Sequence, residues 1–254
     1  MAIMDDIKQQ WRNMREKPLK ERIAYFLSYY KWYTVACIGV IVVIVGILVG
    51  NLLQKDTVIS GVMLNSTNAS SESAYKDFSQ RFLDELELSN KDFEVSITSN
   101  LTYLPSSQEN AENNYGTVQA LLAKTSGSLL DFVVGNLSSS QNLAYSRFFM
   151  DLSKVLSQEQ MQRLAPYIYY IDLAVIEKIE EAVEAGNYDV DIKIPDGKKP
   201  EEMEKPVAIF IDVSSSQWLS EIYTLNAEPI VFAVAENAPR KEAIQKLVDC
   251  LMPQ

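Results

Sequence analysis

Few residues in this chain have the types and spacing that catalysis requires. Ser73 and Lys76 match the S-x-x-K spacing that serves acyl transfer when the lysine lies one helical turn from the serine. The companion motifs S-D-N and K-T-G are absent, and the neighbouring Tyr75 and Phe78 are typical of an ordinary surface helix. The chain has no histidine, which excludes Ser-His-Asp triads, Cys-His pairs and His-ligated metals. We therefore expect a protein that is not an enzyme.

Metal and redox chemistry have equally little support. Three aspartates between residues 189 and 196 resemble a calcium loop only superficially, because Lys193 stands where an oxygen ligand is needed and no glutamate closes the loop. The two cysteines, Cys37 and Cys250, lie in segments too different to pair within one chain, and we expect Cys250 to be a buried free thiol. We expect neither a metal nor a cofactor.

Small polar residues follow three apolar segments and are the candidate ligand-binding residues. Ligands of open α/β sheets bind at the carboxyl ends of strands, and helix N-termini with Ser and Asn donors can hold a carboxylate or a polar solute. The candidates are Asn65, Ser66, Asn136, Ser138, Ser214 and Ser215. Helix capping explains the same residues, since Ser and Asn are preferred at N-cap positions. Both interpretations stay open at the level of the sequence.

The predicted strands would place these residues. Four runs are rich in β-branched and aromatic residues and are apolar at odd and even positions alike, which is typical of strands buried on both faces of a parallel sheet. They are residues 58–64, 129–134, 207–211 and 230–234. Residues 93–98 alternate between apolar and polar and are expected nearer an edge.

Helical patterns separate the strands. They cover residues 73–88, 115–124, 171–185 and 240–251, and Ser157–Gln160 offers a capping box for a further helix. Residues 188–205 interrupt this order and are expected to form a projecting hairpin arm or a strand and loop. The succession predicts an α/β domain with a mostly parallel sheet, covered by helices on both faces.

An uncharged stretch, WYTVACIGVIVVIVGILVGNLLQ, occupies residues 32–54. At about 1.5 Å per residue it would form a helix of roughly 34 Å, long enough to cross a ~30 Å hydrocarbon core. A cleaved signal peptide is the rival interpretation, but the stretch is too long and its end is not A-x-A-like. We expect one transmembrane helix that acts as an uncleaved signal anchor.

The charges on either side of this stretch predict its orientation. Residues 1–31 hold seven basic and four acidic residues, so residues 55–254 hold the remaining 16 basic and 30 acidic ones, a net charge of −14. The positive-inside bias predicts a cytoplasmic, basic and amphipathic head over residues 1–31, with the α/β domain of residues 55–254 outside the cell membrane. So acidic a domain repels nucleic acid, which we do not expect as a partner.

Two sequence motifs resemble a known family. Asp131–Gly135, followed by Asp151–Leu156, resembles the D-V-V core strand and the D-L-S-x-L turn of type II periplasmic, or extracellular, solute-binding proteins. Residues 229–234 and 240–251 look like the closing strand and helix of that family. The head, through Lys20–Phe26 and Tyr29–Trp32, looks like single-pass membrane proteins of unassigned function from Gram-positive anaerobes.

The resemblance implies a reduced version of that fold, because family members usually have two full lobes and are longer. We expect a membrane-anchored, extracytoplasmic, non-catalytic binding or scaffold module whose partners are the membrane and a protein or envelope component. The alternative is a solute-binding receptor, transport-associated or sensory, for a small polar ligand. A closed two-lobe cleft lined by the candidate residues would favour the receptor, and a single lobe with an exposed apolar patch would favour the scaffold.

Overall fold

The chain consists of two compact units in the computed structural model, Met1–Gln54 and Lys55–Gln254. The structure describes residues 18–66, 72–105, 111–187, 193–223 and 228–252, and in the first unit only some of the side chains. Most of the predicted basic head lies outside the described residues. So do residues 188–192 of the predicted hairpin arm, with the first two aspartates of the calcium-like pattern.

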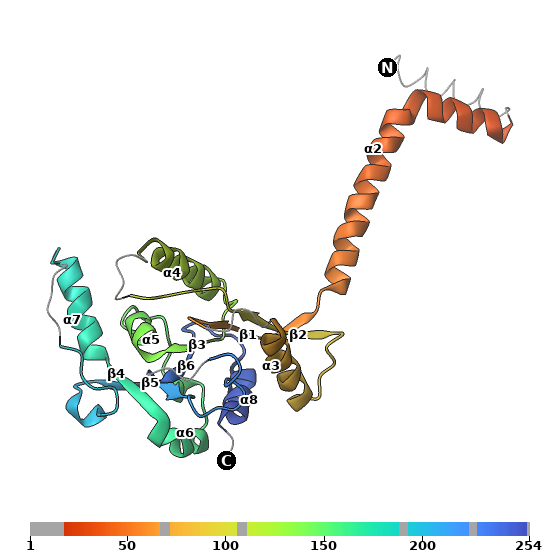
Figure 1. Cartoon of the computed structure of the whole chain (residues 1–254). Helices are drawn as coiled ribbons and strands as arrows, with labels where there is room; N and C mark the ends of the chain where they lie inside the picture. Colours follow the sequence, from red (N-terminus) through yellow and green to blue (C-terminus); the bar gives the residue numbers. More distant parts are fainter. Residues whose placement is uncertain (1–17, 67–71, 106–110, 188–192, 224–227, 253–254) are drawn as a thin grey trace. The chain divides into compact units, whose positions relative to one another are not determined.

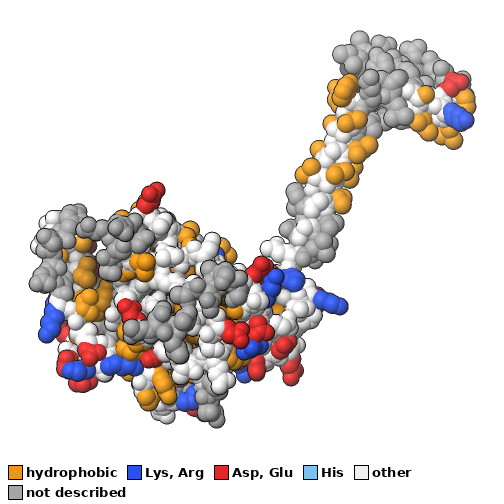
Figure 2. All heavy atoms as spheres, in the orientation of Figure 1, with side chains coloured by type: hydrophobic (Ala, Val, Ile, Leu, Met, Phe, Trp, Pro, Cys, Tyr) orange, Lys and Arg blue, Asp and Glu red, His pale blue; other side chains and the backbone are white. Residues whose placement is uncertain are grey.

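A single long helix, α2 (Leu19–Leu53), makes up the described part of the first unit. Its side chains at Val42–Val45 are each at least 50% exposed, and four consecutive residues point to every side of a helix (Figure 2). No helix in the part of the chain with described side chains combines the length and the apolar character that crossing a membrane requires. The structure therefore does not support the predicted transmembrane helix.

The second unit is built on one six-stranded sheet of order β2-β1-β3-β6-β5-β4 (Figure 1). The strands are β1 (Asp56–Met63), β2 (Phe93–Thr98), β3 (Phe132–Asn136), β4 (Ile168–Asp172), β5 (Pro206–Asp212) and β6 (Ile230–Val234). β1 pairs with β2 and β3 in parallel, whereas the β3–β6, β6–β5 and β5–β4 pairs are antiparallel. The prediction of a mostly parallel sheet is wrong for this half of the molecule, because an apolar run reports burial on both faces and not strand direction.

The edge strand β4 was not predicted. The helix predicted over residues 171–185 is confirmed as α7 (Leu173–Glu184), which begins directly after β4 ends. The aromatic and β-branched residues of β4 suit a strand, and pairing with β5 decides its conformation. Gly197 covers the open side of this strand, since its carbonyl accepts the Tyr170 N–H at 2.8 Å. A Cβ atom at Gly197 would lie 3.1 Å from the Tyr169 ring, so the close approach favours glycine.

Helices cover both faces of the sheet, as expected. Helix α4 (Ala111–Ser126) and α5 (Leu137–Ala144) lie on one face, with α3 (Glu72–Glu85) and α8 (Lys241–Leu251) on the other (Figure 1). The β1-α3-β2 and β2-α4-β3 crossovers step in opposite directions along the sheet, and right-handed connections then place their helices on opposite faces. Short 3₁₀ turns complete the unit at Leu152–Lys154, Ala165–Tyr167 and Pro200–Glu202.

The short helix α6 (Gln158–Leu164) begins with the predicted capping box, which the structure confirms. The Gln160 N–H donates to Ser157 Oγ at 3.2 Å, and the Ser157 N–H donates to Gln160 Oε1 at 3.1 Å. These two bonds satisfy donors that a helix N-terminus otherwise leaves without partners.

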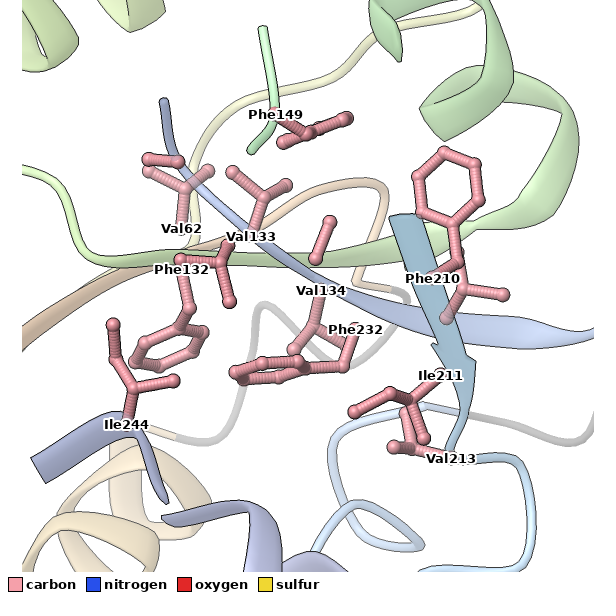
Figure 3. Close-up of a cluster of buried hydrophobic side chains, with 14 of the residues drawn as sticks. Val62, Phe132, Val133, Val134, Phe149, Phe210, Ile211, Val213, Phe232 and Ile244 are labelled. Carbon is pink, nitrogen blue, oxygen red and sulfur yellow. The ribbon is translucent and has the colours of Figure 1, made fainter. Parts of the chain in front are cut away.

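Aromatic side chains fill the core on both faces of the sheet (Figure 3). The rings of Phe132 and Phe232 stack at 5.4 Å on the side of Ile244, and Phe149 lies on the opposite side. Gly61 makes room for this stack, because a Cβ atom there would lie 2.1 Å from Phe132 Cζ. The absence of a side chain at Gly61 therefore lets the Phe132 ring lie between β1 and α8.

Asp131 opens β3 and is fully buried. Its carboxylate accepts hydrogen bonds from the Ser60 N–H at 2.7 Å, from Arg240 Nη1 at 2.8 Å and from the Arg240 N–H at 3.2 Å. A buried carboxylate needs such partners to offset its desolvation. The aspartate of the D-V-V motif thus ties β3 to β1 and to the start of α8.

Candidate binding site at the strand ends

The carboxyl ends of β1, β3 and β5 lie at the same edge of the sheet. β6 is antiparallel to β3, and β5 is antiparallel to β6, so β5 runs in the same direction as β1 and β3. All six candidate ligand-binding residues belong to the segments that follow these strand ends or to the last residue of β3. The topology therefore brings them to one edge, although they come from three separate parts of the chain.

Asn65 organises the loops after β1, β2 and β3. It adopts a left-handed backbone conformation, with φ of 55°, which asparagine tolerates better than most residues. Its Nδ2 donates to the Tyr103 carbonyl at 2.9 Å and to Ser139 Oγ at 3.1 Å, and its Oδ1 accepts the Tyr103 N–H at 2.8 Å. Ser139 Oγ in turn donates to the Tyr103 carbonyl at 2.8 Å. Asn65, Tyr103 and Ser139, which we call the strand-end network, use their polar groups on one another.

Tyr223 supports the same edge from within the core. Its hydroxyl lies 2.9 Å from the carbonyl oxygens of both Leu64 and Val134, so its single proton bridges the ends of β1 and β3. Burial, with a smaller contribution from Tyr75, raises the pKa of Tyr223 well above its usual value. The phenol therefore stays neutral and acts as a structural donor.

Three other candidates also bond within the chain. The Ser66 hydroxyl accepts from Tyr75 OH at 2.7 Å, the Ser138 hydroxyl donates to Glu228 Oε2 at 2.7 Å, and the Ser214 hydroxyl donates to Asp212 Oδ1 at 2.6 Å and accepts the Ile230 N–H at 2.9 Å. These contacts fasten loops to their neighbours. They leave few of the predicted donors for a ligand.

The last two candidates behave differently. Asn136 ends β3 and precedes α5, but its side chain makes no capping hydrogen bond to that helix. Ser215 is exposed and lines a cavity whose other lining residues include neither Asn65 nor Asn136. A ligand pocket shared by Asn65, Asn136 and Ser215 thus stays a prediction.

The cavity at Ser215 is half-open and has a volume of ≈ 480 Å³. It lies between the end of α6, the segment after β5 and the end of α8. Its lining residues are Arg163, Leu164, Tyr167, Ser215, Ser216, Gln217, Trp218, Cys250, Leu251 and Met252, and we call it the Trp218 cavity. The Trp218 ring packs edge-on against Phe78 of α3, with ring centroids 5.8 Å apart at 88°.

Sequence reasoning missed this cavity, although Trp218 stood out as the single tryptophan after residue 54. Arg163, Trp218 and Met252 come from three distant segments, and no local spacing relates them. The only available signal was a bulky aromatic residue in a polar segment after a predicted strand.

Two polar residues of the Trp218 cavity have few hydrogen-bond partners within the described residues. Ser216 is 5% exposed, and its hydroxyl has no hydrogen-bond partner in the part of the chain that the structure describes; Thr125 on α4 is the other such buried hydroxyl there. The Arg163 guanidinium bonds to Asp249 Oδ1, which also accepts from Gln160 Nε2 at 2.9 Å.

Cys250 lines the cavity as a neutral thiol. Burial, reinforced by the nearby carboxylates Glu85 and Asp249, raises its pKa to about 11. Nucleophilic thiols have a lowered pKa instead, so this position is not a reactive cysteine. Cys250 is free, as expected, but its side chain is half-buried and not fully buried as expected.

The residues considered for catalysis lie on the surface. Ser73 and Lys76 are exposed on α3, and the Lys76 ammonium pairs with Glu72 at 2.8 Å. Tyr75 and Phe78 are buried beneath them, which confirms the predicted surface helix. Among the described residues, no cluster of three or more Cys, Asp or Glu side chains has the arrangement of a metal site.

Comparisons with known proteins give little further information. No protein-family model and no curated protein matches the chain. Among solved structures, an ABC substrate-binding protein from Listeria monocytogenes in complex with cycloalternan is similar at 10% identity and a TM-score of 0.24, over 50% of this chain and 34% of that one. This chain thus spans about a third of the length of the Listeria protein.

A second solved structure is a TRAP periplasmic solute-binding protein from Ochrobactrum anthropi, whose C-terminus is bound in its ligand-binding pocket. It is similar at 10% identity and a TM-score of 0.27, over 77% of this chain and 74% of that one. Both are solute-binding proteins, the class that the sequence motifs resemble. TM-scores this low carry no argument about the fold or the function of this chain.

Proposed function

We propose that this chain is a membrane-anchored, extracytoplasmic and non-catalytic module that binds or scaffolds a protein or a component of the cell envelope. One observation carries the anchoring: apolar side chains of α2 such as Val35, 61% exposed, have no cover among the described residues of their own unit. An apolar surface of this extent on a folded chain marks contact with a lipid phase or a partner. Because residues 32–54 are uncharged, we propose that the lipid phase, and not a protein partner, covers these side chains.

The charge distribution supports the orientation. The basic excess lies in residues 1–31, ahead of the uncharged stretch of residues 32–54. Residues 55–254 carry a net charge of −14. Basic segments stay on the cytoplasmic side of a membrane, whereas acidic domains are not held back in this way. We therefore propose a single-pass protein of the cell membrane with a cytoplasmic N-terminus.

The binding or scaffold role is supported by how the α/β unit uses its polar groups. The described strands all belong to one sheet, so the described part of the unit forms a single lobe. The strand-end network ties three loops into one rigid surface. Near it, Leu104, Tyr115 and Leu122 are exposed apolar side chains around α4, and Tyr115 is 68% exposed. A single lobe with exposed apolar side chains suits a protein partner better than an enclosed solute.

The anchoring is tested by a charge inserted into α2. Lysine at both Ile41 and Val43 places two charges near the centre of the proposed span, at about 2.5–3.5 kcal/mol each on insertion scales. We expect the native full-length chain to resist alkaline carbonate extraction and the double variant to be released. Leu129→Lys, at an exposed position of the α/β unit, is the control and should behave as the native chain.

Protease added to spheroplasts tests the orientation of the same chain. The tail should be digested and an N-terminal tag should be protected. Release of the native chain by carbonate would refute the anchor, and protection of the tail would refute the extracytoplasmic location.

A solute-binding receptor remains the second candidate. Among the described residues, the Trp218 cavity favours it, because it offers a hollow with aromatic walls and the guanidinium of Arg163. A ligand that stabilises the chain through this cavity would support the receptor, as developed next.

A further inference from the structure

We infer that the Trp218 cavity binds a small carboxylate whose body is aromatic or apolar. This inference goes beyond the scaffold role proposed above and does not depend on the membrane anchor. It rests on the charge, the wall composition and the unengaged donors of one cavity.

The charge at the cavity is the reverse of that of the domain around it. Residues 55–254 carry 30 acidic and 16 basic residues, yet Arg163 is the one charged residue among those that line the cavity. Arg163 at the wall attracts an anion, although its partner Asp249 and the nearby Glu85 offset part of that charge. The cavity is therefore a local site for a negative ligand on a negative domain.

Arg163 has donors to spare. A guanidinium carries five N–H groups and matches a carboxylate through two parallel hydrogen bonds. Among the described residues it bonds to Asp249 Oδ1, whose oxygen is also held by Gln160. Arg163 and Asp249 both line an adjacent hollow, and of the two only Arg163 also lines the Trp218 cavity, so its remaining donors can serve a ligand there.

The remaining walls suit an apolar body. Trp218 and Tyr167 provide aromatic surface, and Leu164, Leu251 and Met252 provide aliphatic surface. The edge-on contact with Phe78 fixes the Trp218 ring before any ligand arrives, and flat rings pack well against such a surface. The volume of ≈ 480 Å³ lies within the ~300–1,000 Å³ range of small-molecule sites.

One serine adds a donor at the same wall. Ser215 is exposed at the cavity, whereas the hydroxyl of Ser216 is buried and lacks a partner among the described residues. The buried Ser216 hydroxyl is closed off from the cavity, and the exposed Ser215 hydroxyl can donate to an acceptor that enters from outside. A carboxylate oxygen is such an acceptor, and it also matches Arg163.

The test uses the full-length chain in detergent micelles, with phenylacetate and indole-3-acetate as probes and ligand-observed NMR as the measurement. Phenylacetamide lacks the negative charge, and acetate lacks the ring. We expect both aromatic acids to bind with dissociation constants below about 1 mM, and phenylacetamide and acetate to bind at least tenfold more weakly. Absence of binding by both aromatic acids up to about 10 mM would overturn the inference.

Matched variants locate the site. Arg163→Gln should weaken phenylacetate binding at least tenfold. The affinity of Arg163→Lys should lie between that of the native chain and that of Arg163→Gln, because lysine keeps the charge but loses the planar guanidinium. Lys246→Gln is the control: Lys246 lines the adjacent hollow with Arg163 but not the Trp218 cavity, so binding should not change. Equal binding by Arg163→Gln and the native chain would refute the site.

The source of the carboxylate is resolved by two peptides. A tripeptide that ends in phenylalanine with a free carboxylate presents the same chemistry as phenylacetate, and its C-terminal amide does not. Tighter binding of the free-acid peptide than of phenylacetate would identify a peptide C-terminus as the ligand, and the reverse order would identify a small free acid. Equal affinity of the acid and amide peptides would count against a carboxylate site.

Discussion

Two buried serines at one edge of the sheet are used in opposite ways. Ser139 follows β3 and is 2% exposed; its hydroxyl donates to the Tyr103 carbonyl and accepts from Asn65. Ser216 follows β5 and is 5% exposed, and its hydroxyl has no partner among the described residues. The first belongs to the strand-end network and the second to the Trp218 cavity.

The difference separates polar groups that build the protein from a polar group left without a partner among the described residues. Leaving a buried hydroxyl without a partner costs free energy that a bonded one does not. The strand-end network therefore stabilises the fold and offers few donors, although sequence reasoning selected part of it as a ligand site. Ser216, at the wall of the Trp218 cavity, instead carries the cost of a buried hydroxyl without a partner among the described residues.

The largest expected effect is at Asn65. Asn65→Ala removes three side-chain hydrogen bonds and places alanine in a left-handed conformation, so we expect unfolding free energy to fall by about 2–4 kcal/mol. Asn65→Gly is the matched control, because glycine accepts this φ and loses only the hydrogen bonds. Chemical denaturation of both variants measures the difference. If the two variants lose the same unfolding free energy, the left-handed conformation of residue 65 contributes nothing to the effect.

Tyr223→Phe should have the next largest effect. It removes the proton that bridges the carbonyls of Leu64 and Val134 and leaves them buried, for an expected loss of about 1–3 kcal/mol. Tyr75→Phe removes a partly buried hydroxyl bonded to Ser66 and should cost less. Denaturation curves that ranked the two variants in reverse order would contradict the structural role of Tyr223.

Asp172 extends the comparison to the opposite edge of the sheet, and it makes stability depend on pH. Burial raises the pKa of its carboxyl, but hydrogen bonds from the backbone N–H groups of Glu204, Lys205 and Ala174, together with Lys178, outweigh burial and hold the pKa below the usual value of 3.8. The stabilisation by the carboxylate is therefore fully present above about pH 4. It is lost as the pH falls through the lowered pKa of the folded state.

Asp172→Asn should lower the unfolding free energy by about 1–2 kcal/mol at pH 7, since hydrogen bonds to a charged group become neutral ones. The difference between the native chain and the variant should stay constant down to about pH 4 and shrink below it. Denaturation measured from pH 7 to pH 2 checks both statements. A difference that grew with acid would show that the sign is wrong.

The smallest effects come from the two serines. Ser139→Ala should cost about 1–2 kcal/mol, because it leaves the donor of Asn65 with fewer partners. Ser216→Ala should cost about 0 kcal/mol, or stabilise slightly, because it removes an unsatisfied hydroxyl. Equal destabilisation by the two substitutions would remove the distinction between network and cavity.

Much of the architecture can be predicted from local sequence. The strands at Phe93–Thr98 and Ile230–Val234, the capping box at Ser157 and the closing helix all occur where the residue patterns place them. Gly186, with φ of 75°, lies just beyond the end of α7, as a glycine stop signal predicts. These features follow from side-chain periodicity and from backbone chemistry within a few residues.

The candidate site could be predicted only in part. The sequence identified Asn65, Ser66, Ser138 and Ser214 as residues at strand ends, and the structure brings them to one edge of the sheet. It could not tell that Asn65, Ser66 and Ser138 bond to the chain itself, because their partners Tyr103, Tyr75 and Glu228 lie on segments whose approach depends on tertiary packing. The bond from Ser214 to Asp212 is local instead, since two residues separate them in the chain.

By itself, the sequence determined that the chain has an uncharged apolar stretch over residues 32–54 followed by an acidic α/β domain, since apolar periodicity and charge are properties of local stretches. The tertiary structure alone decided that β4 is a strand, that half the sheet is antiparallel, and that Arg163, Trp218 and Met252 meet around one cavity. Strand direction and the meeting of distant segments follow from which surfaces pack together. That choice minimises exposed apolar area over the whole unit, and no short window of sequence contains it.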